Sequence, residues 1–178
     1  YCLTKDPLLA SWARKSFFGS QSGLDMSENS VSNNDQMPIF AFNRLVEVFG
    51  SLKGKKVAFL GVSYRGDVGD TRYTPVETLV KKVREAQSDI LLHDPYVSFW
   101  QEQKCRIESN IDNILSSSPD IIIISTGHKE YKQQETLQKI MAMNPIKIYD
   151  TVGLLSEEQI LVLQGKHSVS ILGRGDIN

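Results

Sequence analysis

The feature that most constrains the fold is a series of short apolar runs that alternate with helix-like segments. The runs cover residues 57–60, 90–92, 120–125, 146–149 and 169–172, and the third contains four consecutive isoleucines. Strands without alternating polar positions are covered on both faces, as in parallel sheets. The segments 75–86, 111–115, 130–143 and 159–163 read as helices between them. This alternation predicts an α/β fold with a parallel sheet between helices.

The first 52 residues lack this alternation of strands and helices, and their pattern predicts a helical lead-in before the α/β domain. Asp6 is suited to cap a helix over residues 6–18, with Pro7 at its first position. Glycines break the chain at 19–23, and a second helix follows over 25–49, with Pro38 as a candidate kink. Residues 53–178 then form a Rossmann-like domain.

Composition excludes several classes of protein. The net charge is −1 and the pI about 6.4, so no global basic field attracts nucleic acid or an anionic membrane. No apolar run approaches the roughly 20 residues of a membrane span. Cys2 and Cys105 fit no metal-ligand spacing. Without a signal peptide, we expect both as reduced thiols in the cytoplasm.

The loop after the first predicted strand is the clearest candidate for binding an anion. Ligands of open parallel sheets bind outside the carboxyl ends of the strands. Residues 61–72 contain three glycines that allow close backbone approach, and Arg65 and Arg72 carry charges suited to phosphate oxygens.

Spacing alone leaves alternatives open for this loop. In a dinucleotide-binding domain, Asp94 would hold a ribose, but the glycines are spaced G-x4-G-x2-G and not G-x-G-x-x-G. A P-loop would need lysine where the chain has Asp67. The other alternative is a structural turn tied by Asp–Arg pairs.

Five segments together carry a resemblance to a known family. Residues 61–75 (GVSYRGDVGDTRYTP), 93–97 (HDPYV), 1–7 (YCLTKDP), 34–38 (NDQMP) and 125–131 (STGHKEY) resemble, in order and spacing, motifs of the UDP-glucose/GDP-mannose dehydrogenase family. The resemblance covers nearly the whole chain and corresponds to the family's C-terminal portion.

The resemblance implies a fold, a reaction and partners. Residues 53–178 would be a UDP-sugar-binding domain, and an NAD-binding domain would precede the chain. The expected activity is NAD-dependent oxidation of the C6 alcohol of a UDP-sugar to a uronic acid, for polysaccharide biosynthesis. The helix over 25–49 would form a homodimer through its apolar residues Phe42, Leu45, Val46 and Phe49.

The resemblance also implies roles for three residues near the start of the chain. Cys2 would attack the aldehyde intermediate, giving a thiohemiacetal and then a thioester. Asp6 would assist proton transfer, and Lys5 would stabilise anionic intermediates. The alternatives are an inert thiol, a helix cap and a solvated lysine.

For the UDP-sugar, the resemblance points to Tyr64, Arg65, Asp70, Arg72 and His128. Arg65 and Arg72 would contact phosphate, with Asp70 orienting Arg72. Tyr64 would pack on the nucleotide or a neighbouring helix. His128 would either contact the nucleotide or serve as a hydrogen-bonded structural residue.

Two positions depart from the family pattern. Arg65 stands where the family usually has lysine, and Val152 stands where it often has an arginine that contacts the sugar. These departures support one alternative function, a non-catalytic nucleotide-binding module derived from the family.

Overall fold

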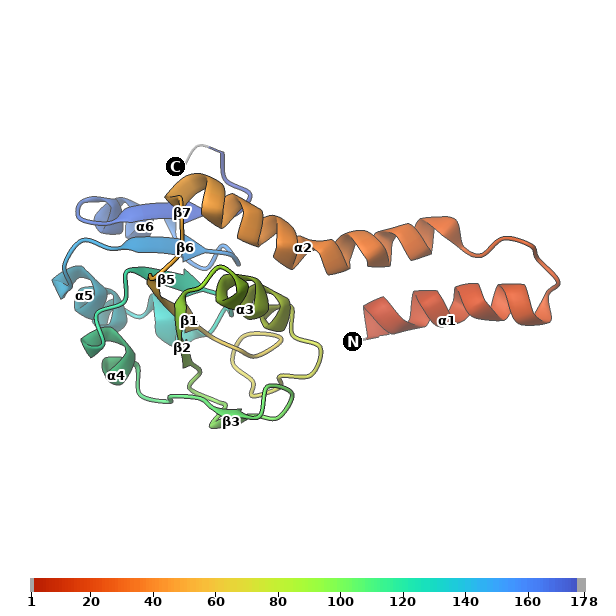
Figure 1. Ribbon diagram of the computed structural model, residues 1–178, viewed down its shortest axis with the longest axis horizontal. Coiled ribbons are helices and arrows are strands. Elements are labelled where there is room, and N and C mark those ends of the chain that lie inside the picture. Colours follow the sequence, from red (N-terminus) through yellow and green to blue (C-terminus); the bar gives the residue numbers. More distant parts are fainter. Residues whose placement is uncertain (1, 176–178) are drawn as a thin grey trace.

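A parallel five-stranded sheet forms the centre of the α/β part of the molecule, and a helical hairpin projects from it (Figure 1). The computed structural model describes residues 2–175, with side chains from residue 4 onward. The strands lie in the order β2-β1-β5-β6-β7. Their bounds are β1 (Lys56–Leu60), β2 (Asp89–His93), β5 (Ile121–Ile124), β6 (Lys147–Asp150) and β7 (Ser168–Ile171). All neighbouring pairs are parallel, which confirms the predicted α/β class.

Helices cover both faces of the sheet because strand residues point alternately to either side. Val57 and Phe59 pack with α3 (Val76–Glu85) and the C-terminal half of α2 (Asp25–Phe49). Ala58 and Leu60 pack on the other face, with α4 (Ile111–Ser116), α5 (Gln134–Ala142) and α6 (Glu157–Gln164). Two apolar layers therefore sandwich the sheet.

The second half of α2 belongs to the packed α/β unit, so the predicted boundary at residue 52 falls inside one core. Leu45 and Phe49 are buried against the sheet, and Phe42 and Val46 pack beside them. The Tyr149 hydroxyl donates to the Ala41 carbonyl at 3.1 Å. The four apolar residues predicted to form a dimer contact are thus used within the chain, because they face its own sheet.

The first half of α2 projects from the sheet and runs antiparallel to α1 (Cys2–Phe17) (Figure 1). Lys15 Nζ lies 3.0 Å from a carboxylate oxygen of Glu28, which also accepts from the Ser11 hydroxyl. The Leu24 N–H donates to the same hydroxyl at 2.8 Å. These contacts join the two helices and return the start of α1 towards the domain.

The N-terminal helix begins earlier than predicted. Because α1 starts at Cys2, Asp6 lies within the helix and is not its cap. Pro7 also lies inside the helix, where its missing N–H removes one backbone hydrogen bond. Asp6 instead lies 3.7 Å from Lys5 Nζ, and both side chains are exposed.

Two further details differ from the sequence prediction. The helix predicted over 130–143 is divided into η1 (Lys129–Lys132) and α5, with extended backbone at Gln133. A short antiparallel pair, β3 (Phe99–Trp100) and β4 (Cys105–Arg106), was not predicted. Within the described part of the chain, no helix is both long and apolar enough to cross a membrane.

Candidate functional site

The topology directs attention to the loops after β1 and β5. From β1 the chain moves to β2 on one side of the sheet, whereas β5, β6 and β7 follow one another on the other side. Loops that leave neighbouring strands in opposite directions open a crevice at the carboxyl edge, where ligands of this fold type bind. Here the crevice is bounded by residues 61–75 and 125–128.

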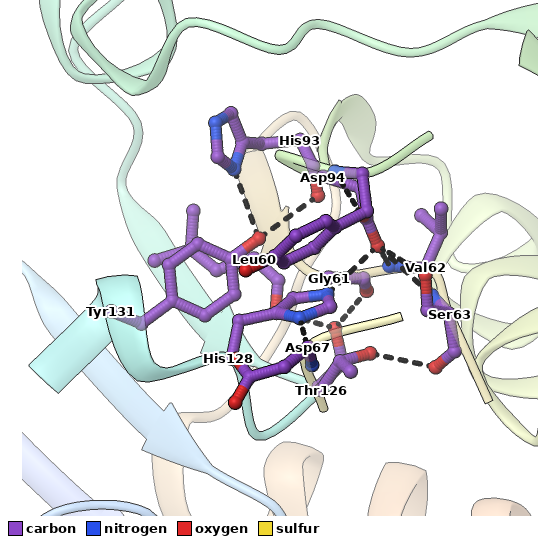
Figure 2. A network of polar contacts seen from close by, with 12 residues as sticks. Leu60, Gly61, Val62, Ser63, Asp67, His93, Asp94, Thr126, His128 and Tyr131 are labelled. Atoms are coloured by element: carbon purple, nitrogen blue, oxygen red, sulfur yellow. Dashed lines mark hydrogen bonds and ion pairs between the residues drawn. The ribbon is translucent and has the colours of Figure 1, made fainter. Parts of the chain in front are cut away.

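Asp94 is the centre of a buried hydrogen-bond network at this edge (Figure 2). Its Oδ2 accepts from the N–H of Val62 at 2.9 Å and from the N–H and hydroxyl of Ser63 at 3.1 and 2.8 Å. The same oxygen accepts from His128 Nε2 at 3.1 Å, and Oδ1 accepts from the Tyr96 N–H at 2.9 Å. The carboxylate therefore fixes the start of the 61–72 loop.

The environment favours the ionised form of Asp94. Burial by itself raises the pKa of this carboxyl, but the hydrogen bonds from His128, Val62, Tyr96 and Ser63 outweigh it and lower the pKa. Asp94 thus stays an acceptor for every donor that surrounds it.

His128 connects Asp94 to the middle of the loop. Its ring is fully buried, and Nδ1 accepts from the Asp67 N–H at 2.8 Å. Since a backbone N–H can only donate, Nδ1 carries no proton and Nε2–H donates to Asp94. Both ring nitrogens are occupied, which leaves none for a nucleotide. These hydrogen bonds correspond to the structural role predicted for His128, and contact with a nucleotide stays a prediction.

A second histidine–tyrosine pair borders this network. His93 Nδ1 lies 2.9 Å from the Tyr131 hydroxyl, and Nε2 lies 3.2 Å from the Ser109 carbonyl oxygen. Burial lowers the pKa of His93 and raises that of Tyr131, so both stay neutral. Sequence reasoning gave His93 no catalytic role and missed the network, because nothing in the spacing of these residues signals their contact.

Side chains after β5 close the crevice against the β1 loop. The Ser125 hydroxyl donates to the Gly61 carbonyl at 2.7 Å, and the Thr126 hydroxyl donates to the Ser63 carbonyl at 2.8 Å. A Cβ on Gly66 would lie 2.2 Å from the Gly127 carbonyl oxygen, and one on Gly69 would lie 2.4 Å from the Tyr96 carbonyl oxygen. The loop glycines therefore allow close packing of protein backbone.

The charged residues of the loop form local ion pairs. Arg72 binds Asp70 through two hydrogen bonds of 2.9 and 2.8 Å, which lower the pKa of Asp70 to about 2. Asp70 is thus placed to orient Arg72, and the part of both residues in binding a UDP-sugar stays a prediction. Asp67 instead pairs with Lys129, whose N–H and Nζ lie 3.0 and 3.2 Å from its carboxylate. Arg65 is exposed beside them.

A cleft of about 600 Å³ lies between the helical hairpin and this loop. Its walls include Thr4 of α1, Asn34 and Asp35 of α2, and Tyr64 and Tyr73 of the loop. Three segments far apart in the sequence therefore meet at one hollow, and each carries one of the motifs described above. The side chain of Cys2 lies outside the described residues.

A smaller apolar cavity of about 180 Å³ adjoins the cleft and shares Met37, Pro38 and Pro75 with it. Val152, which is 47% exposed, lines this cavity. The loop that carries Val152 is fixed by Asp150, which accepts from the N–H groups of Val152 and Leu155, both at 3.0 Å. Burial raises the pKa of Asp150 despite these bonds.

A larger hollow of about 760 Å³ lies at the opposite edge of the sheet, near Lys55, Asp120 and Lys147. It contains none of the predicted site residues, and it faces the amino ends of the strands. The cleft at the carboxyl edge is therefore the better candidate. In the described part of the chain, no group of three or more His, Cys, Asp or Glu side chains could hold a metal ion.

Known proteins resemble the chain along its whole length. The family model for the UDP-binding domain of the UDP-glucose/GDP-mannose dehydrogenase family matches residues 58–157. The UDP-N-acetyl-D-mannosamine dehydrogenase of Methanococcus aeolicus is 26% identical over 98% of this chain and 38% of that protein. The enzyme of the same name from Methanocaldococcus jannaschii is 30% identical over 70% of this chain and 29% of that protein.

A solved structure supports the same relationship. The crystal structure of the NDP-N-acetyl-D-galactosaminuronic acid dehydrogenase from Methanosarcina mazei has a TM-score of 0.79 and 26% identity. The match covers 97% of this chain and 38% of that one. The chain thus spans well under half the length of these relatives.

Proposed function

This chain belongs to the UDP-glucose/GDP-mannose dehydrogenase family, and we propose that it forms the UDP-sugar-binding, C-terminal part of an NAD-dependent nucleotide-sugar dehydrogenase. The observation that carries the proposal is the cleft at which the segments of residues 1–7, 34–38 and 61–75 meet. Its volume of about 600 Å³ lies within the range of small-molecule sites.

The chemistry of the cleft walls supports a nucleotide as the ligand. Tyr64 and Tyr73 are 44% and 69% exposed, so their rings offer apolar faces for a base. Arg65 and Arg72 do not line the cleft, but they are exposed on the same loop, each next to one of these tyrosines, and carry the positive charge that phosphate oxygens need. Asp70 already occupies the guanidinium of Arg72, so phosphate would have to share or replace that contact.

The α/β domain itself does not fit NAD. A dinucleotide requires glycines that admit its pyrophosphate to the backbone. Here Gly66 and Gly69 lie against the carbonyls of Gly127 and Tyr96, and the N–H groups of Val62 and Ser63 are bound to Asp94. We therefore assign NAD to a part of the enzyme outside this domain.

We extend the proposal to the start of α1. The thiolate of Cys2 would trap the sugar aldehyde as a thiohemiacetal and hold the oxidised sugar as a thioester until water releases it. The backbone of Cys2 lies in the first turn of α1, where the helix dipole favours a thiolate. Lys5 and Asp6 follow within one turn and would serve charge stabilisation and proton transfer.

A homodimer remains part of the proposal, with a revised contact surface. The large apolar side chains exposed on the projecting hairpin are Leu8, Leu9, Trp12, Phe17, Phe18, Met26, Met37 and Phe40. Several large apolar side chains exposed on one projecting element are typical of a protein–protein contact surface. If it forms the dimer, light scattering will show a dimer for the wild type and a monomer for Phe40→Glu.

Calorimetry with a UDP-sugar tests the binding proposal directly. A charge-assisted phosphate contact contributes about 1.5–3 kcal/mol, so Arg72→Ala should weaken binding by about tenfold or more. Arg84→Ala, on an exposed residue in the last turn of α3, is the matched control and should leave affinity unchanged. Equal affinities of the two variants would reject this loop as the phosphate site.

A further inference from the structure

We infer that Asp35 is a binding residue for the sugar of the nucleotide-sugar, and that its carboxylate accepts hydrogen bonds from sugar hydroxyls. The site is the helix wall of the cleft, which is the side formed by Thr4, Asn34 and Asp35. This inference rests on the proposed UDP-sugar binding and assigns the sugar to one side of that cleft.

The charges inside the cleft do not suit a phosphate. Among the described residues that line it, the charged side chains are the carboxylates of Asp35 and Glu77. Arg65 and Arg72, the proposed phosphate contacts, are exposed on the 61–75 loop outside this lining. Because carboxylates repel phosphate oxygens, the pyrophosphate should lie at the rim with the arginines, and an uncharged group should occupy the interior.

The carboxylate of Asp35 has acceptor capacity that the protein does not use. Glu77 already accepts from Gln103 Nε2 at 2.8 Å. Asp35 is exposed, and its carboxylate makes no hydrogen bond or ion pair with any residue that the structure describes. An ionised carboxylate is an acceptor only, and each of its two oxygens can accept more than one hydrogen bond. It therefore suits a ligand that offers several hydroxyl donors, as a sugar does.

The proposed reaction favours the helix wall for the sugar. The carbon to be oxidised must come within reach of the thiolate proposed for Cys2, whose backbone lies in the first turn of α1. Thr4 follows two residues later and lines the same cleft as Asp35. The loop wall carries the rings of Tyr64 and Tyr73, which we propose for the base. The two ends of the nucleotide-sugar would thus contact opposite walls.

The helix wall also has room for a sugar and a second polar side chain to hold it. The cleft adjoins another hollow of about 370 Å³, and the two share Thr4, Asn34 and Tyr64. Asn34 therefore lies where the two hollows meet. Its amide can both donate and accept hydrogen bonds next to the carboxylate of Asp35.

Calorimetry with UDP-glucose and with UDP separates contact with the sugar from contact with the nucleotide. Each variant is compared with the wild type for the same ligand, because the two ligands differ in charge. Asp35→Ala should weaken the binding of UDP-glucose by about tenfold or more, as for the loss of one charge-assisted hydrogen bond. Its affinity for UDP should stay the same or rise, because the substitution removes a negative charge from the cleft.

Two control variants accompany this measurement. Asp25→Ala removes a carboxylate from the first turn of the same helix, outside both hollows, and should leave both affinities unchanged. Arg72→Ala should weaken both ligands alike, because both contain the pyrophosphate. Asp35 is exposed and alanine is favourable in a helix, so Asp35→Ala should fold, and circular dichroism checks this.

Each outcome decides the inference. Equal losses for UDP-glucose and UDP in Asp35→Ala would overturn it, because the contact would then be with the nucleotide. So would unchanged binding of UDP-glucose, or tighter binding of both ligands, which would show that the carboxylate only repels phosphate. In these cases the wild type still binds, and the proposed function stands. If the wild type binds neither ligand, the proposed function fails and the inference fails with it.

Discussion

Replacement of Asp94 by asparagine tests whether the carboxylate, and not merely a side chain of that size, organises the carboxyl edge. Oδ2 accepts four hydrogen bonds, from Val62, from Ser63 twice and from His128, and Oδ1 accepts one from Tyr96. An amide oxygen at the Oδ2 position could keep the four. Its NH₂ group would then face the Tyr96 N–H, donor against donor.

The expected cost follows from these contacts. A partly buried N–H that loses its acceptor costs about 1–3 kcal/mol, and the four remaining bonds lose their charge assistance. We expect Asp94→Asn to lower the free energy of unfolding by about 3 kcal/mol. Urea denaturation followed by the fluorescence of buried Trp100 measures it.

The matched control is Asp120→Asn. Asp120 also accepts a backbone N–H, that of Lys56 at 2.8 Å, but its side chain is 45% exposed at the opposite edge of the sheet. We expect a cost below about 1 kcal/mol there. If Asp94→Asn lowers the free energy of unfolding by no more than Asp120→Asn does, the reasoning about the buried Asp94 network is refuted.

The pH dependence of Asp94→Asn gives an independent check. Because the folded-state pKa of Asp94 is lowered, the ionised carboxylate stabilises the fold fully above the unfolded value of about 3.9. This contribution is lost as the pH falls through the lower folded-state pKa. The difference between wild type and variant should therefore be constant above about pH 5 and shrink only in stronger acid.

Three further predictions concern stability. Gly66→Ala should lower the free energy of unfolding, measured by urea denaturation, by about 2 kcal/mol, because its Cβ would lie 2.2 Å from the Gly127 carbonyl oxygen. Gly175→Ala is the control, since a Cβ there meets open space and should leave the free energy of unfolding unchanged. Tyr149→Phe should cost about 1 kcal/mol by the same assay, since it removes the hydrogen bond to Ala41; an unchanged value would show that this bond does not hold α2 to the sheet. Burial lowers the pKa of His93, so its contribution to stability is complete above about pH 6.5 and is lost as the pH falls towards the lower folded-state value. The melting temperature should accordingly drop less in acid for His93→Asn than for the wild type.

The central elements were predictable because their signal is local. Buried parallel strands require uninterrupted apolar runs, and residues 121–124 could hardly form anything else. The short pair β3 and β4 has two residues in each strand, too few for any periodicity. The predicted start of the first helix, at residue 6, was wrong. Asp6-Pro7 is a typical beginning of a helix, but α1 extends four residues further towards the N-terminus, to Cys2. The apolar face of α2 was predicted correctly, but which surface would cover it depends on tertiary structure.

The candidate site shows why residue types predict a location better than they predict a role. Glycines and arginines after β1 pointed to the carboxyl edge of the sheet, where ligands of open parallel sheets bind. Their tasks differ from the simplest interpretation: Gly66 and Gly69 admit the backbone of other loops, and Arg72 binds Asp70. Asp94, considered first only as a ribose ligand, proves to be the acceptor that fixes the loop. Hydrogen-bond partners 31 to 61 residues apart produce no periodic pattern in a sequence. The Asp94 network is therefore visible only in the folded structure, where the strands bring these loops together.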